Sequence, residues 1–288
     1  MSTPVGDFGE FSVAAGTDAT PGSTAESYPE RVQPRSQRVS TPPERPFRLR
    51  PGPILVVIFL ALSFRFLPPL TVDLLSDYIR LPVHGARLPF YFADHLVMLL
   101  VAVGLIALAR RRSNIDFGLH MPYGRSYVAT AIVLSFLFGI VMALVDYAPY
   151  LIRGIAPPLD DAFSGINVTG WMVYQGLYSG PTEEIPFRAL LVTYLASTMP
   201  GKVRYGRLSM NGAGVVVAAL FAIGTAATAL IASPLLVAIS QVLYVFFLGL
   251  CLAYWLEKSS SVLAPAIGHN VAFGVKQALL FGLVAALR

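Results

Sequence analysis

Long apolar runs follow one another along most of this chain, with short polar segments between them. They occupy residues 54–76, 90–109, 126–147, 167–198, 212–232, 235–256 and 261–287. A helix needs about 20 residues to cross the hydrocarbon core of a bilayer, so each run predicts one membrane-spanning helix. The fourth run is longer than one straight crossing needs, and Ser179-Gly180-Pro181 interrupts it, which predicts a broken or steeply tilted helix. The pattern predicts seven spans and leaves eight open.

The first 50 residues show no such pattern. They are rich in Pro, Ser and Thr and poor in aliphatic residues, which predicts a disordered tail, and they lack the form of a secretory signal peptide. Of all 288 residues 55% are hydrophobic and 13% are charged, and the mean hydropathy is +0.65, whereas soluble domains are about 25% charged. The expected fold class is therefore all-α. Residues 51–288 should form a polytopic transmembrane helical bundle of about seven or eight spans, and residues 1–50 a disordered tail.

Basic residues cluster beside three of the apolar runs and predict the orientation. Arg35, Arg38, Arg45, Arg48 and Arg50 precede the first run, Arg110, Arg111 and Arg112 follow the second, and Lys202, Arg204 and Arg207 follow the fourth. With seven spans all three clusters lie on one side, which the positive-inside rule assigns to the cytoplasm. We expect an integral protein of the plasma membrane with a cytoplasmic N-terminus. Because these clusters explain the net charge of +5, and no basic patch is interleaved with aromatic residues, we expect no nucleic-acid partner.

Two adjacent glutamates and an arginine stand inside the fourth run, in the sequence EEIPFR. Charges within a membrane cost a few kcal/mol and usually mark function. On a helix Glu184 and Arg188 are i and i+4, in the favourable order for an ion pair, while Glu183 points about 100° away and is expected to lack that partner. A free carboxylate in a poorly hydrated site suits a general base that acts on water. Pro186 leaves the carbonyl of Thr182 without a helical donor, which favours a wet cavity nearby. A purely structural ion pair between helices stays open as an alternative.

These residues resemble the first motif of the CPBP family, the CAAX-protease and bacteriocin-processing (Abi) intramembrane proteases. The segment from Phe246 to His269 is similar to the run that leads into the last motif of the family, and Asp116 to Pro122 resembles an element that precedes its core. The resemblance covers about residues 113–275. It implies an endopeptidase that hydrolyses a peptide bond of a membrane-associated or prenylated substrate with glutamate-activated water. By this resemblance Glu183 is the base, Glu184 and Arg188 support it, and His269 is the later histidine of the site. The implied partners are membrane lipid and a membrane-associated peptide or protein substrate.

Two motif positions differ from the family pattern. Four residues after Phe221, where the family has a histidine that positions water, stands Thr225, and four residues after His269, where it has an oxyanion-binding asparagine, stands Phe273. A phenylalanine cannot donate a hydrogen bond. Asn270 carries an amide, but one helical step turns it about 100° from His269. The possible site-lining positions are Phe221, Thr225, Asn270 and Phe273. The two departures from the family pattern favour an alternative function. The chain would then be a catalytically impaired family member that acts as a membrane scaffold or an immunity-type partner-binding protein.

The remaining charged residues offer less to the predicted site. His95 follows Asp94 at the start of the second run, where an interfacial position is expected, and Lys276 lies on the same helix face as His269. We expect no cofactor, and zinc is disfavoured because the glutamates and His269 lack a second histidine. A transporter with proton-coupled carboxylates is a third hypothesis.

Overall fold

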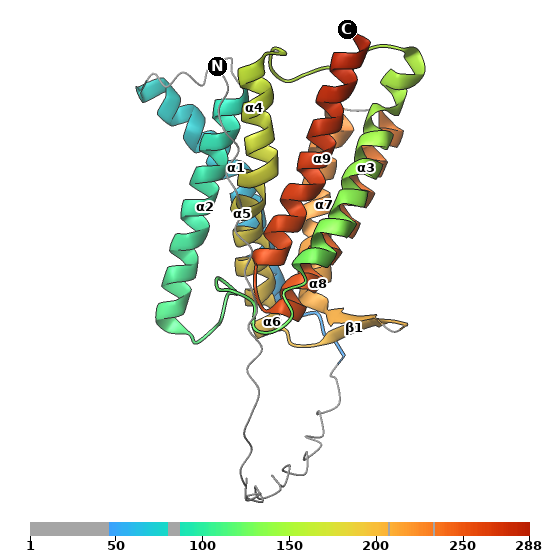
Figure 1. The fold of residues 1–288 in the computed structure, drawn as a ribbon. Helices are drawn as coiled ribbons and strands as arrows, with labels where there is room; N and C mark the ends of the chain where they lie inside the picture. Colours follow the sequence, from blue (N-terminus) through green and yellow to red (C-terminus); the bar gives the residue numbers. More distant parts are fainter. Residues whose placement is uncertain (1–45, 80–86, 207, 233) are drawn as a thin grey trace, which may run out of the picture. The chain divides into compact units, whose positions relative to one another are not determined.

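A computed structural model describes residues 46–79, 87–206, 208–232 and 234–288. The described chain is a bundle of helices, which confirms the predicted all-α class, with one short hairpin at the end of the bundle (Figure 1). The long helices are α1 (Pro51–Ile79), α2 (Arg87–Arg112), α3 (Val128–Arg153), α7 (Gly212–Ala232), α8 (Leu235–Ser259) and α9 (Leu263–Leu287). A composite helix consists of α4 (Gly165–Val173), η1 (Tyr174–Tyr178), α5 (Ser179–Glu184), η2 (Ile185–Val192) and α6 (Thr193–Thr198). The predicted disordered tail lies outside the described residues, except for residues 46–50.

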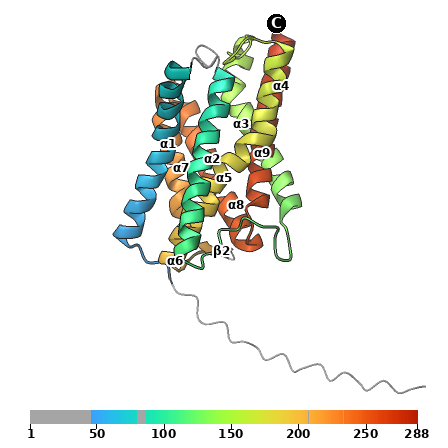
Figure 2. The same cartoon turned by 90° about the vertical axis from the view of Figure 1, so that its left-hand side faces the viewer.

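The seven predicted spans correspond to the six long helices and the composite helix. Five of them, α1, α2, α3, α8 and α9, are long and apolar enough to cross a membrane. In α7 the criterion is met over a shorter stretch, Gly212–Ala226, and the composite helix is divided into shorter segments. Both nevertheless run along the bundle beside the long helices (Figures 1 and 2). The structure is thus consistent with seven crossings.

The described members of the three predicted basic clusters gather at one end of the bundle. The C-terminal end of α2 with Arg110, Arg111 and Arg112, the start of α1 and the β-hairpin all lie at the lower end in Figure 2, and the C-terminus lies at the upper end. The hairpin pairs β1 (Lys202–Tyr205) with β2 (Leu208–Asn211) in antiparallel register. This arrangement is the one that seven crossings predict from the charge pattern.

The last residues of the predicted tail contact the hairpin. Pro46 forms an isolated bridge with Lys202, and the Phe47 N–H donates to the Lys202 carbonyl at 3.4 Å. The Phe47 ring also packs where a Cβ on Gly212 would lie. Residues 46 and 47 of the predicted tail therefore pack against the bundle, because the apolar ring of Phe47 has a packing partner there.

The composite helix is continuous, so of the two predicted alternatives, a broken or a steeply tilted helix, the break at Ser179-Gly180-Pro181 is wrong. It widens into π-helix on both sides of α5 instead, at η1 and at η2. At the first junction the Ser179 N–H donates to the carbonyl of Tyr174, five residues back. The second π-helix begins beside Pro186, which cannot donate a hydrogen bond to the preceding turn. Such widened turns are rare and occur frequently at functional sites.

The segment η2 forms the centre of the bundle. Its residues from Pro186 to Val192 are all buried and pack against α1, α2 and α7. On the other side of the bundle α3 and α9 approach closely, since a Cβ on Gly139 would lie 2.5 Å from the carbonyl oxygen of Ala272. Tight packing around η2 fixes the helix that carries the glutamates.

A second ion pair, whose carboxylate is buried, lies among α3, α8 and α9. Lys276 contacts Asp146 at 2.5 Å, and Tyr244 and Gln241 donate hydrogen bonds to the same carboxylate oxygen at 3.1 and 3.2 Å. Lys276 therefore compensates an aspartate on α3 rather than either glutamate of the first motif. The pair joins three helices at a place separate from the predicted site.

Candidate active site

Glu184 and Arg188 form the buried ion pair that their spacing predicts. Arg188 Nε lies 3.1 Å from Glu184 Oε2, and the two side chains are 1% and 0% exposed. The guanidinium also lies over the ring of Phe221, 5.0 Å from its centroid. The other oxygen of the same carboxylate, Glu184 Oε1, lies 2.9 Å from Nδ1 of His269. Because a carboxylate accepts and does not donate, this contact places a proton on Nδ1 and orients the imidazole.

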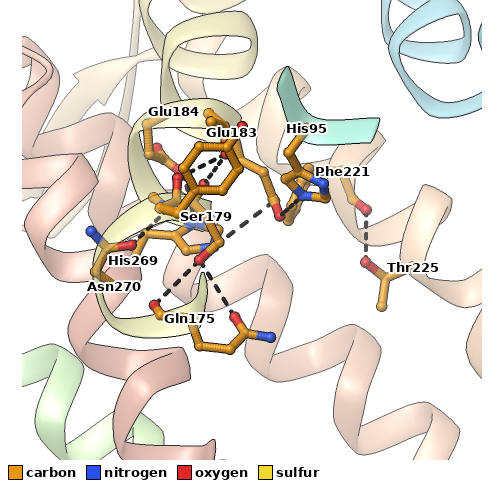
Figure 3. A network of polar contacts seen from close by, with 12 residues as sticks. His95, Gln175, Ser179, Glu183, Glu184, Phe221, Thr225, His269 and Asn270 are labelled. Carbon is orange, nitrogen blue, oxygen red and sulfur yellow. Dashed lines mark hydrogen bonds and ion pairs between the residues drawn. The ribbon is translucent and has the colours of Figure 1, made fainter. Parts of the chain in front are cut away.

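Glu183 is not isolated, which corrects the expectation that it lacks a partner. Its Oε1 lies 3.1 Å from Nε2 of His95, and its Oε2 lies 3.9 Å from Nε2 of His269 (Figure 3). The first distance is a hydrogen bond, whereas the second is too long for one and is short enough for a water molecule to bond to both atoms. The side chain of Glu183 keeps 20% exposure, in contrast to the fully buried Glu184. The side chain of the first glutamate is therefore accessible, and that of the second is not.

His95 lies in the site, and the expectation that it has an interfacial role is wrong. Its side chain, on α2, is only 11% exposed, and besides Glu183 it contacts the hydroxyl of Tyr174 and Asp94 Oδ2, the latter 3.5 Å from Nδ1. Tyr174 belongs to η1, so the wide turn places an aromatic side chain against the histidine. The sequence signal available was the Asp94-His95 pair at the start of an apolar run. It was ambiguous because its partner is 88 residues away.

Asn270 fastens the composite helix to α9 instead of pointing at the carboxylates. Its Oδ1 accepts from the Gly180 N–H at 2.6 Å, and its Nδ2 donates to the carbonyl of Leu177 at 3.0 Å. A Cβ on Gly180 would overlap the Ala266 carbonyl oxygen and the Asn270 amide, so only glycine permits this approach. Both polar ends of the amide are thus engaged at the junction between η1 and α5.

The two substituted motif positions have different surroundings. Thr225 donates its hydroxyl to the carbonyl of Phe221 at 3.1 Å and lies apart from the glutamates in Figure 3. The Phe221 ring packs edge-on against Phe187 and lies under the guanidinium of Arg188. Phe273 stacks on the ring of His269, with centroids 4.6 Å apart and an interplanar angle of 27°. Phe273 therefore supports the orientation of His269, and Phe221 that of Arg188.

The donor set bears on the prediction that zinc is disfavoured. That prediction relied on the lack of a second histidine, but His95 is a second histidine beside the glutamates. Within the described ranges, however, no group of three or more His, Cys, Asp or Glu side chains is arranged to hold a metal ion. One carboxylate oxygen of Glu184 is already occupied by His269, and the other faces Arg188.

Together the fold and this cluster define a polytopic integral membrane protein with carboxylates and histidines enclosed among its helices. Residues 165–273 match the family described as type II CAAX prenyl endopeptidase Rce1-like. This match confirms the resemblance to the CPBP proteases over the composite helix, α7, α8 and the start of α9. It is shorter than the predicted core of residues 113–275 and does not include the element from Asp116 to Pro122. No curated protein and no solved structure matches the chain.

Proposed function

We propose that this protein is an intramembrane endopeptidase of the CPBP/CAAX-protease type. The matched family consists of proteases, which supports a peptidase activity in a membrane. The single observation that supports the chemistry best is the pair of unlike glutamates. Glu184 is fully buried and contacts Arg188 and His269. Glu183 is partly exposed, and its Oε2 lies 3.9 Å from Nε2 of His269. This is the arrangement that a base for water requires.

In the proposed reaction Glu183 Oε2 takes a proton from a water molecule that also contacts His269. The resulting hydroxide attacks the carbonyl carbon of the scissile peptide bond. The protonated Glu183 then gives its proton to the leaving amine as the C–N bond breaks. Glu184 and Arg188 hold His269 in place from behind and do not touch the substrate. No step uses a metal or a cofactor.

The proposed substrate is a peptide segment held at or in the membrane, with or without a prenyl group. We further propose the plasma membrane as the location, with the basic end of the bundle in the cytoplasm, because the described basic clusters share that end. The substrate would reach Glu183 from among the helices, since the glutamate stands near the middle of the composite helix.

The test is cleavage of a panel of membrane peptides, prenylated and unprenylated, by purified protein in liposomes. Glu183→Gln removes the base while keeping the shape of the side chain, and we expect the rate to fall by about 10²–10⁴-fold. Glu257→Gln is the matched control, because Glu257 lies near the hairpin, where it accepts from the Asn211 N–H, and its amide can still accept this bond.

Normal activity of Glu183→Gln would refute the proposed role of this residue. A folded wild-type protein that cleaves no peptide of the panel would refute the protease assignment and support the partner-binding alternative. Cleavage of prenylated peptides alone would identify the lipid as part of what is recognised.

A further inference from the structure

The histidine that contacts Glu183 most closely comes from outside the segment that matches the family. His95 stands on α2, and the match begins only at residue 165. Its Nε2 lies 3.1 Å from Glu183 Oε1. Since an ionised carboxylate only accepts hydrogen bonds, Nε2 carries the proton and donates it to this contact. One oxygen of the carboxylate is thereby occupied, and the other faces His269.

The surroundings of His95 hold its ring in this position. Asp94 Oδ2 lies 3.5 Å from Nδ1, and the Tyr174 hydroxyl lies within 2.9 and 3.1 Å of the two ring nitrogens. The Tyr91 ring meets the imidazole edge-on at 6.5 Å between centroids. A side chain held on several sides and only 11% exposed has few other orientations.

Thr225 does not occupy this position. Its hydroxyl is bonded to the carbonyl of Phe221 on its own helix, and Figure 3 shows it apart from Glu183. The histidine expected on α7 is therefore absent from the chain, while an imidazole from α2 reaches the same carboxylate. The chain has a second histidine at the site, supplied by a different helix.

We propose that His95 is a positioning residue for hydrolysis at this site. It replaces the histidine that the family pattern places at position 225. By donating Nε2–H to Oε1 it holds the Glu183 carboxylate so that Oε2 faces the water beside His269. The inference depends on the proposed function, because a residue that positions a base has a role only if that base acts.

The test compares two substitutions of His95 in the liposome assay. Leucine fills the space without a donor, and glutamine retains an N–H at the end of a side chain of similar reach. We expect His95→Leu to lower kcat by about 10²-fold with KM changed less than about threefold, because an interaction made in the transition state is lost. His95→Gln should stay within about tenfold of the wild-type kcat, because the donor is kept. His120→Gln is the matched control, since His120 lies in the connection between α2 and α3.

Thr225→His in the His95→Leu background should not restore activity, because Thr225 lies apart from Glu183 (Figure 3). Unfolding midpoints are measured for each variant, so that a loss of activity is separated from a loss of structure. A purely structural role would reduce the activity of both His95 variants in step with their unfolding midpoints, and this result would overturn the inference.

Near-normal kcat of His95→Leu, while Glu183→Gln is inactive, would overturn the inference and leave the proposed function intact. Full activity of Glu183→Gln would instead overturn the proposed function, and the inference with it. Rescue by Thr225→His would overturn the inference, because a histidine on α7 would then be able to position Glu183.

Discussion

Replacing Arg188 by methionine should strongly destabilise the protein, because it leaves Glu184 as a buried charge without its cation. The two side chains are 1% and 0% exposed and 3.1 Å apart. Removal of one member of a buried pair costs about 3–5 kcal/mol. Glu184 keeps its contact with His269 Nδ1 at 2.9 Å. We therefore expect Arg188→Met to lower the free energy of unfolding by about 3 kcal/mol, at the lower end of that range.

Removing the carboxylate instead of the guanidinium should lower the free energy of unfolding by more. Glu184→Gln keeps an oxygen for His269 but leaves a buried guanidinium, whose Nη1 and Nη2 have no hydrogen-bond partner among the described residues. We expect a loss of about 4–5 kcal/mol. Independent effects would add to about 7–8 kcal/mol in the double variant, but removal of both charges leaves no uncompensated ion, so the double variant should lose only about 3 kcal/mol or less.

The assay is reversible unfolding of the four proteins in mixed micelles, followed by the fluorescence of Trp171 and Trp255, both of which are buried. A double-mutant cycle gives the coupling energy between the two positions. Additive effects, or a loss below about 1 kcal/mol for each single variant, would contradict the reasoning, since such values are typical of exposed ion pairs. Asp146→Asn is a useful comparison, because it breaks the separate pair with Lys276.

Three further predictions test other parts of the structure. Gly180→Ala should destabilise the protein by about 1–3 kcal/mol and lower activity, because a methyl group would push α5 away from α9; normal unfolding and cleavage would contradict this. Cleavage should persist after treatment with a metal chelator, and inhibition reversed by added zinc would refute the metal-free mechanism. The hydrogen bond to the Met121 carbonyl, followed by the contacts with Asp116, raises the pKa of His120 in the connection between α2 and α3. Its contribution to stability is therefore fully present below the unfolded pKa of about 6.5 and is lost as pH rises through the higher folded value, so His120→Gln should lower the unfolding midpoint at about pH 5.5 and have less effect at about pH 8.5.

The helical class and the ion pair could be predicted because both depend on local spacing. Apolar runs of bilayer length predict spans whatever packs beside them, and the i, i+4 spacing of Glu184 and Arg188 determines their contact on any regular helix. The resemblance to the last motif of the family indicated His269 as well. These features require no knowledge of which helices are neighbours.

The contact of His95 with Glu183 could not be predicted in this way, because it depends on the packing of α2 against α5. Local sequence patterns also miss the π-helical turns, since prolines at positions 181 and 186 are as compatible with a break as with a widened helix. Asn270 shows the same limit. Its partner, the backbone at Gly180, is set by the close approach of two helices, which local spacing does not reveal.

The two widened turns make the site depend on the length of the chain as well as on its residues. A π-helical turn contains about one residue more than an α-helical turn, so each one rotates the following segment by about 100° relative to a regular α-helix. Loss of a single residue between Tyr174 and Tyr178 would let η1 return to α-helix. The segment before the deletion and the segment after it would then be rotated relative to each other, so Glu183 could not keep its contact with His95 while η2 stays in its place. Insertions and deletions in this helix are thus more damaging than most substitutions, even where every motif residue is kept.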